Sequence, residues 1–382
     1  MRVLQTAGGG RLAERLPAQP PVLPGLNYVR PLGSGGFADV YLYGQDMPRR
    51  EVAVKVLPDS LHTPELVRMF NAEIDVLARL ATHPSIVTIY DAGLAPDGRP
   101  YISMEYCPAS YAKRYRQERI PVHEVLEVAV KMASALETAH RSGVIHRDIK
   151  PSNILVTGYG TPVLADFGIS ASIAGAARAS MALSVPWSAP EVVLEQSAGT
   201  VASEVWGIAA TIYSLLAGRS PFERSDRAEN SREHLTRRIA RAAYTPIGRG
   251  DVPPALEAVL QRAMNREPSR RQQSALQFAE DIRAVQAAAG LVPTPVEVRV
   301  ESYRPSSRLD LDDTAARWAQ RPSVAYPTTR KYQPNAPLHR DEDGTVTTMP
   351  RRRRVVWPWY VAGGAGLIAV GAAAAWLIGT VI

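Results

Sequence analysis

The chain has 382 residues, a hydrophobic content of 46% and a formal net charge of +7. This length allows two domains, or one large domain with appended segments, and the apolar content is enough for a sizeable core. The single cysteine, Cys107, excludes an intrachain disulfide and a multi-cysteine metal site, which fits a reducing compartment. The basic residues are unevenly placed, with one run at residues 351–354, so the charge does not indicate a nucleic-acid partner.

The first 24 residues contain several glycines and prolines, which predicts a flexible leader. They have no apolar core of signal-peptide length, so we expect no cleaved secretion signal. A strand-like stretch begins at Tyr28 and leads into the glycine-rich residues 33–42, GSGGFADVYL. Glycines let the backbone turn tightly over phosphates and expose its N–H donors. The alternative for this segment alone is an ordinary hairpin turn.

Residues 51–57 alternate like a strand, and Lys55 interrupts their apolar run. Lys55 therefore lies either at an exposed edge or beside an anion. The next segment, residues 65–80, has helical spacing of its apolar residues. Glu73 lies in this helix, either directed at a partner or on a solvated face.

The stretch that organises the chain is residues 146–153, HRDIKPSN, which follows a predicted helix at residues 122–142. Phosphoryl transfer needs a carboxylate to accept a hydroxyl proton, a cation to offset charge and an oxygen to hold a metal ion. Asp148, Lys150 and Asn153 provide these groups. A lone HRD tripeptide would more simply be a polar loop between a helix and a strand.

A second carboxylate motif follows Asp148. Asp166, Phe167 and Gly168 come 18 residues after Asp148. This distance leaves room for a short hairpin that brings the two carboxylates to one site. Together, the two motifs are far more specific than either one.

HRDIKPSN, followed at this distance by DFG, resembles the catalytic loop of bacterial eukaryotic-type (Hanks-type) serine/threonine protein kinases. The resemblance covers roughly residues 27–288. It implies an α+β, two-lobed protein kinase fold, with a small β-rich lobe, a larger helical lobe, and ATP with Mg²⁺ or Mn²⁺ between them. It implies catalytic roles for Asp148 and Lys150, and metal-holding roles for Asn153 and Asp166.

The resemblance also implies a nucleotide site. Lys55 would grip the phosphates and pair with Glu73. Met104 would be the gatekeeper, and the backbone of Glu105 and Cys107 would bind the adenine edge. The ATP-binding residues that it implies are Leu32, Gly33, Ser34, Gly35, Gly36, Val40, Ala53, Lys55, Glu73, Met104, Glu105, Cys107 and Leu155. Cys107 is expected to be a small hinge residue rather than a redox centre.

Several positions depart from the family's pattern. Ala38 stands at the third glycine of the glycine-rich loop. Ser184, for which we expect a structural role, and Trp187 stand where the family has threonine and tyrosine. Glu204 replaces the aspartate that begins a large buried helix, so we expect it to cap the catalytic loop less tightly. These departures motivate an alternative: a pseudokinase, or nucleotide-binding scaffold, at the membrane.

Residues 168–189 are rich in Ala, Ser and Gly, which is typical of a mobile loop. Arg147 suggests that a phosphate on this loop orders the active state. We predict Ser180 as an autophosphorylation site. The resemblance implies that Glu191, just after the loop, pairs with Arg271.

Residues 289–354 are rich in prolines and charges with little periodicity, which predicts a disordered linker. Threonines beside an acidic cluster at residues 341–348 are either solvated linker or a phosphorylation or docking site. Residues 355–382 carry no charge and, at about 1.5 Å per residue, would span a bilayer as a helix. The arginines at 351–354 and the aromatic residues after them place the N-terminal side in the cytoplasm. A buried hydrophobic helix is the alternative.

The sequence therefore predicts a single-pass, tail-anchored protein of the cell membrane that transfers the ATP γ-phosphate to Ser/Thr hydroxyls of proteins, including its own. The predicted parts are a leader at 1–24, a kinase domain at 25–288, a linker at 289–354 and a transmembrane helix at 355–382. The predicted partners are protein substrates and the lipid bilayer, without nucleic acid. Small residues at 371, 375 and 379 would permit a homodimer. A membrane adapter acting through the tether alone is a third hypothesis.

Overall fold

The computed structural model describes residues 18–34, 38–57, 64–167 and 184–298, and two short strands, β9 (Leu338–Arg340) and β10 (Val346–Thr348). Within helix α1 the side chains at positions 64–67, 69 and 73 are not described. The chain divides into two compact units, Met1–Tyr303 and Arg304–Ile382. β9 and β10 form an antiparallel pair in the second unit, and all other described elements belong to the first.

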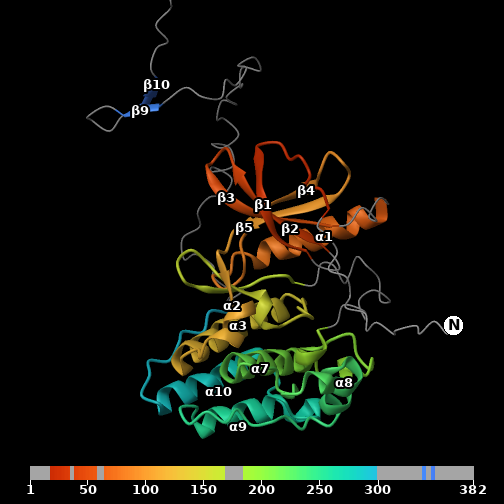
Figure 1. Ribbon diagram of the computed structural model, residues 1–382, viewed down its shortest axis with the longest axis vertical. Helices are drawn as coiled ribbons and strands as arrows, with labels where there is room; N and C mark the ends of the chain where they lie inside the picture. The colour runs from red at the N-terminus through yellow and green to blue at the C-terminus, as the bar shows by residue number, and fades with distance from the viewer. Residues whose placement is uncertain are drawn as a thin grey trace, which may run out of the picture. The chain divides into compact units, whose positions relative to one another are not determined.

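The N-terminal lobe is a five-stranded antiparallel sheet with the strand order β1-β2-β3-β5-β4, accompanied by one helix (Figure 1). Its elements are β1 (Leu26–Ser34), β2 (Asp39–Gln45), β3 (Arg50–Val56), α1 (Pro64–Leu80), β4 (Ile89–Leu94) and β5 (Pro100–Glu105). β2 and β3 show the predicted alternation, because Tyr41, Tyr43, Val52 and Val54 form a buried cluster on one face. The intervening side chains, including Lys55, face the opposite side.

The C-terminal lobe is mostly helical and is built around α7 (Val201–Ala217). Its other α-helices are α2 (Tyr111–Gln117), α3 (Val122–Arg141), α6 (Pro190–Val193), α8 (Arg232–Ala240), α9 (Pro254–Ala263) and α10 (Ala275–Ala288). It also contains the 3-10 turns η1 (Pro151–Asn153), η2 (Val185–Trp187), η3 (Arg227–Asn230) and η4 (Pro268–Arg270). Helix α7 is apolar on all sides because it is the centre of the lobe, and Trp206 and Tyr213 are fully buried. A capping box at Thr200 begins it and Gly218, with a φ of 72°, ends it.

A small sheet at the junction of the lobes positions the polar site. Its strands are β6 (Ala109–Ser110), β7 (Ile154–Val156) and β8 (Pro162–Leu164), in that order. β7 and β8 form the short hairpin that the spacing of the two carboxylate motifs predicted. A bridge between Ile86 and Leu164 connects this hairpin to the segment before β4.

Residues 18–24 do not form the loose leader that the sequence predicted. They lie along the sheet, where the Tyr41 hydroxyl donates to the Ala18 carbonyl at 2.5 Å and the Tyr43 hydroxyl donates to the Pro21 carbonyl at 2.6 Å. Burial is the main reason that the pKa of Tyr43 rises to about 12. The prediction was wrong for these residues because the contacts use backbone carbonyls, which leave no trace in composition. Residues 1–17 lie outside the described part of the chain.

Residues 289–298 also differ from the prediction of a disordered linker. The side chains of Gln286 and Thr294 are buried, and the Gln286 amide donates to the Thr294 hydroxyl at 2.8 Å while accepting from the Thr294 N–H at 2.9 Å. Further along, His83 Nε2 lies 2.6 Å from the Glu297 carbonyl oxygen. This segment therefore runs from α10 to the turn that follows α1. Beyond it, only β9 and β10 of the predicted linker are described.

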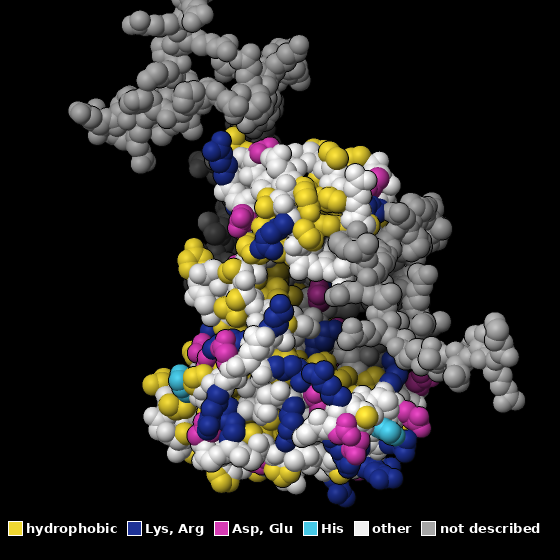
Figure 2. Space-filling model, in the orientation of Figure 1, with side chains coloured by type: hydrophobic (Ala, Val, Ile, Leu, Met, Phe, Trp, Pro, Cys, Tyr) yellow, Lys and Arg dark blue, Asp and Glu magenta, His cyan; other side chains and the backbone are white. Residues whose placement is uncertain are grey.

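Charged side chains of both signs are interspersed over the helical lobe on the face drawn in Figure 2. Surface ion pairs there and elsewhere include Arg224 with Glu229 at 2.7 Å and Arg237 with Glu233 at 3.2 Å. Exposed pairs of this kind contribute little to stability. They show that basic side chains of α8 and of the segment before η3 have acidic neighbours nearby in the chain.

Among the described residues, none of the helices combines the length and the apolar character needed to cross a membrane. The predicted span, residues 355–382, lies outside that part of the chain. The anchoring helix therefore stays a prediction.

Candidate active site

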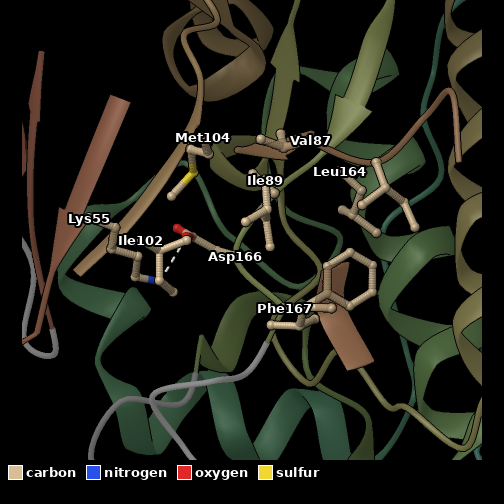
Figure 3. A pocket seen from close by; sticks show the side chains of 11 residues that line it. Lys55, Val87, Ile89, Ile102, Met104, Leu164, Asp166 and Phe167 are labelled. Carbon is tan, nitrogen blue, oxygen red and sulfur yellow. Dashed lines mark hydrogen bonds and ion pairs between the residues drawn. The ribbon is translucent and has the colours of Figure 1, made fainter. Parts of the chain in front are cut away.

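Lys55 and Asp166 meet although they lie 111 residues apart in the chain. Lys55 comes from the inner face of β3 and Asp166 follows β8, and Lys55 Nζ lies 2.8 Å from Asp166 Oδ1 (Figure 3). The Lys55 ammonium is the main cause that holds the pKa of Asp166 below its usual value. Asp166 has a φ of 62°, a costly conformation for a residue with a Cβ, so its surroundings must impose it.

Asp148, Lys150 and Asn153 also come together, as the sequence predicted. Lys150 Nζ lies 2.6 Å from Asp148 Oδ2, and the Asn153 amide donates to the Asp148 carbonyl at 2.7 Å and to its Oδ2 at 3.2 Å. Lys150 Nζ also donates to Ser184 Oγ at 2.9 Å. Asp148 Oδ1 is buried and has no hydrogen-bond partner among the described residues. Buried polar atoms normally have a partner, so this oxygen is the natural acceptor for a substrate hydroxyl.

Glu204, at the start of α7, holds the backbone of the catalytic loop. Its Oε1 accepts from the Arg147 N–H at 2.7 Å, and its Oε2 accepts from the His146 N–H at 3.0 Å. His140 Nε2 lies 2.8 Å from the same Oε2 and adds a third contact. Arg147 has a φ of 68°, so this cap holds a strained residue. The bond lengths are ordinary, so Glu204 caps the catalytic loop as the sequence predicted, and the comparison with aspartate stays a prediction.

Asn153 and Asp166 are neighbours because the Ala165 N–H donates to the Asn153 carbonyl at 2.9 Å. They offer one amide oxygen and one carboxylate, and the Asn153 amide nitrogen faces Asp148, so its oxygen is the atom presented as a ligand. Mg²⁺ takes only a few protein oxygens and completes its shell with water and substrate phosphates. The two residues therefore fit a magnesium ion bound together with a nucleotide. No cluster of three or more His, Cys, Asp or Glu suited to a metal occurs in the described residues.

An apolar pocket lies behind the Lys55–Asp166 pair (Figure 3). Besides these two residues it is lined by Leu77, Ile86, Val87, Ile89, Ile102, Met104, Leu164, Ala165 and Phe167. Met104, the predicted gatekeeper, also packs with Cys107 and Leu155 against a neighbouring buried cluster of Val87, Val163 and Ala165. Burial raises the pKa of the Cys107 thiol to about 12, which fits a structural rather than a redox role.

The remaining predicted ATP-site residues lie on the surrounding strands. Val40 is the cross-strand partner of Lys55, and Ala53 is the partner of Met104. Those at the end of β1 are Leu32, Gly33 and Ser34, and Glu105 ends β5. Those outside the described residues are Gly35, Gly36 and the Glu73 side chain, and the predicted phosphorylation site Ser180 also lies outside them. The expected Lys55–Glu73 pair is therefore untested, and the described partner of Lys55 is Asp166.

Sequence reasoning did not assign a role to His146 or to the apolar residues behind Met104. His146 Nε2 lies 2.9 Å from the Ala165 carbonyl oxygen, and its ring centroid lies 4.6 Å from that of Phe167. His146 belongs to the first carboxylate motif and Phe167 to the second, so the two motifs could have predicted this contact. The apolar lining could not be found this way, because an alternating strand pattern does not tell which buried residues face a pocket.

The segment after the predicted mobile loop is fixed by a buried ion pair. Arg271 Nη1 and Nη2 lie 2.7 Å and 2.9 Å from the two carboxylate oxygens of Glu191. The guanidinium also lies 5.1 Å from the ring centroid of the buried Trp206. This confirms the pair that the sequence predicted between Glu191 and Arg271.

A β-rich lobe and a helical lobe thus bring a lysine, two aspartates and an asparagine to one cleft, which defines a phosphotransferase of the protein kinase class. The sequence profile of the protein kinase domain matches residues 26–282. Because this is more than half of the 382 residues, the chain belongs to the protein kinase family.

Bacterial serine/threonine kinases are similar to the chain. It is 38% identical over 344 residues to the serine/threonine-protein kinase PknK of Mycobacterium tuberculosis, which covers 86% of this chain and 29% of PknK. It is 33% identical over 267 residues to PrkC of Bacillus subtilis, covering 67% of this chain and 39% of PrkC. The kinase domain of PknI of Mycobacterium tuberculosis, solved as a mutant, has a TM-score of 0.53 and 29% identity, covering 71% of this chain and 100% of that domain.

These likenesses confirm the predicted membership of the bacterial Hanks-type serine/threonine kinases. The chain spans less than a third of the length of PknK. What the likeness shows is therefore the family of the matched region.

Proposed function

We propose that the protein is a serine/threonine protein kinase that transfers the γ-phosphate of ATP to Ser/Thr hydroxyls of proteins, including its own. The observation that supports it most is the convergence of the Lys55–Asp166 pair with the cluster of Asp148, Lys150 and Asn153. Relatives whose names describe serine/threonine-protein kinases add support.

In the proposed mechanism the chain supplies position and charge rather than covalent chemistry. Lys55 binds the nucleotide phosphates, and Asn153 and Asp166 hold Mg²⁺, which offsets phosphate charge when it is bound. Asp148 orients the substrate hydroxyl and accepts its proton at Oδ1. Lys150, placed between Asp148 and Ser184, stabilises the charge of the phosphoryl group during transfer.

The alternative, a pseudokinase or nucleotide-binding scaffold, is less well supported. Its motivation included Glu204, yet this residue caps the catalytic loop with ordinary bond lengths. The described groups with a direct chemical role form two bonded sets, Lys55 with Asp166 and Asp148 with Lys150 and Asn153.

The experiment compares the full-length chain with its Asp148→Asn variant, using radiolabelled ATP and Mg²⁺. We expect phosphate transfer to fall by a factor of about 10² to 10⁴, because the general base is lost, while ATP binding persists. Asp226→Asn is the matched control, since Asp226 caps the exposed turn η3 and asparagine caps equally well. Undiminished transfer by Asp148→Asn would refute the proposed role, and no transfer by the wild-type chain would favour the scaffold.

We also propose that residues 355–382 anchor the protein in the cell membrane as a single helix, with the kinase domain at 25–288 on the cytoplasmic side. The support is the uncharged sequence, the arginines at 351–354 and the aromatic residues that follow them. Membrane fractions should retain the full chain and lose a variant without residues 355–382. Equal sedimentation of both would contradict the anchor.

Regulation by a loop phosphate is a further part of the proposal. Arg147 is exposed next to Asp148, and its guanidinium would offer a cationic partner to a phosphate on Ser180. Phosphopeptide mapping of active protein should find Ser180 modified, and Arg147→Ala should remove the activation. An active preparation with an unmodified loop would rule this out.

A further inference from the structure

Residues 18–24, called the strap below, cover the face of the N-terminal sheet that is turned away from the nucleotide site. Side chains alternate along β2, so Asp39 lies on the same face as Tyr41 and Tyr43. Both tyrosines donate to strap carbonyls, and Leu23 of the strap is buried with them in one cluster. The strap is therefore docked by side-chain packing as well as by hydrogen bonds.

Asp39 joins the strap to the end of β1. The Ala18 N–H donates to Asp39 Oδ2 at 3.0 Å, and the Ser34 hydroxyl donates to Asp39 Oδ1 at 2.5 Å. Asp39 is only 2% exposed. A buried carboxylate requires donors to remain charged, so the strap and Ser34 stabilise the same anion.

The Asp39 carboxylate lies where β1 and β2 meet the glycine-rich turn. Ser34 is the last residue of β1, Asp39 is the first residue of β2, and the two are cross-strand partners. They are the described residues on either side of the glycine-rich turn that the sequence assigns to the ATP phosphates. Small displacements of phosphate donors have large effects on binding and transfer. Holding the ends of the two strands together thus sets where these donors lie.

We propose that the strap, acting through Asp39, positions the glycine-rich strand pair for ATP binding, so that Ala18 and Asp39 are positioning residues of the kinase. This inference rests on the proposed function, because its first test measures how tightly the protein binds ATP. The strap contacts neither Lys55 nor the catalytic loop in any described bond, so its loss should change the KM for ATP far more than kcat.

The sharpest variant is Ala18→Pro in the full-length chain, because proline lacks the N–H that donates to Asp39. Ala18→Gly keeps this N–H and is the matched control. Losing one hydrogen bond to a buried carboxylate should raise the KM for ATP and the Kd of a fluorescent ATP analogue about three- to tenfold. We expect kcat to change less than about twofold, since the catalytic loop is untouched.

A second pair of variants tests the anion itself. Asp39→Ala removes the bond from Ser34 as well as the bond from Ala18, so it should raise the KM for ATP at least as much as Ala18→Pro. Combining the two should add little, because without the carboxylate the Ala18 N–H has no acceptor left to lose. Asp46→Asn is the control, since Asp46 is an exposed carboxylate on the same lobe that accepts from Asn27 at 2.7 Å. Full additivity of Ala18→Pro and Asp39→Ala would overturn the proposal.

A measurement that does not depend on enzymatic activity separates the strap proposal from the kinase proposal. Hydrogen exchange of the peptide around residues 32–41, measured without nucleotide, should quicken in Ala18→Pro and Asp39→Ala but not in Ala18→Gly or Asp46→Asn. Unchanged exchange and unchanged Kd in the first two variants would overturn the strap proposal while leaving the kinase proposal intact. A wild-type chain that transfers no phosphate, but shows these exchange differences, would refute the kinase proposal alone.

Discussion

The two walls of the cleft are held in different ways. The lower wall, the catalytic loop, is fixed by buried polar bonds: Glu204 accepts two backbone N–H groups, and Asn153 donates twice to Asp148. The upper wall is a sheet whose position depends on strand pairing and packing, with Lys55 as its charged group facing the cleft.

This difference predicts two kinds of response to mutation. Removing one partner from a buried polar network leaves the others unsatisfied, which is costly for stability and for the loop's geometry. Removing a contact from the upper wall shifts phosphate-binding groups while the sheet persists. Substitutions in the lower wall should therefore lower both the stability of the fold and the rate of phosphate transfer. Substitutions in the upper wall should lower the affinity for nucleotide by graded amounts.

The largest effect is expected for Glu204→Ala. It leaves the His146 and Arg147 N–H groups and His140 without their acceptor, so the free energy of unfolding should fall by about 3–5 kcal/mol. Transfer should fall at least about 100-fold in whatever folded protein remains, because the loop is no longer held. Urea unfolding and steady-state rates measure the two effects.

Glu204→Asp sharpens this test, since it restores the residue typical of the family but shortens the side chain. We expect a smaller loss, about 1–2 kcal/mol, because the cap geometry is built for the longer side chain with His140 as a third contact. An Asp variant that is more stable than the wild type would show that glutamate is a defect here.

Lys55→Met should weaken ATP binding about tenfold or more while leaving the fold largely intact. The variant removes the phosphate-binding cation and also the main cause of the low pKa of Asp166. Lys131→Met is a suitable control, because Lys131 pairs with Glu127 one turn away on α3. ATP titration by calorimetry measures the loss, and an affinity equal to that of the wild type would contradict the role of Lys55.

The smallest effect concerns His83, which connects the residues after α10 to the turn after α1. His83 Nδ1 accepts from the Ser85 N–H at 3.0 Å, so Nε2 carries the proton that is donated to the Glu297 carbonyl. Burial holds the pKa of His83 below its ordinary value of 6.5. Acid adds a second proton to the ring, at Nδ1, and the folded chain binds that proton less readily than the unfolded chain does. The stability present above pH 6.5 is therefore lost as the pH falls below it.

His83→Gln should accordingly cost about 1 kcal/mol at pH 8 and less at pH 5.5. Urea unfolding at both pH values checks this, with the exposed His123 as the matched control in His123→Gln. A pH dependence of stability identical to that of the wild type would contradict the assignment.

The sequence predicted the lower wall well because its residues lie within one short motif whose chemistry dictates their spacing. Through the resemblance to a family it also predicted that Lys55 and Asp166 line one nucleotide site and that Glu191 pairs with Arg271. It did not predict the direct contact between Lys55 and Asp166, because the partner that it expected for Lys55 was Glu73. It could not predict the docking of residues 18–24 or 289–298, because these segments bind through backbone carbonyls and a few polar side chains. The third contact of Glu204, from His140, was missed because nothing in the sequence around either residue points to the other.

The most direct test of the account is a double-mutant cycle across the cleft, with Lys55→Met from the upper wall and Asp166→Asn from the lower. Affinity for ATP is measured by calorimetry on the full chain with and without Mg²⁺. We predict that Mg²⁺ strengthens binding to the wild type, that each variant weakens Mg²⁺-ATP binding about tenfold or more, and that the two losses are not additive. Additive losses, or a wild-type chain that does not bind ATP, would contradict the claim that both walls hold one nucleotide.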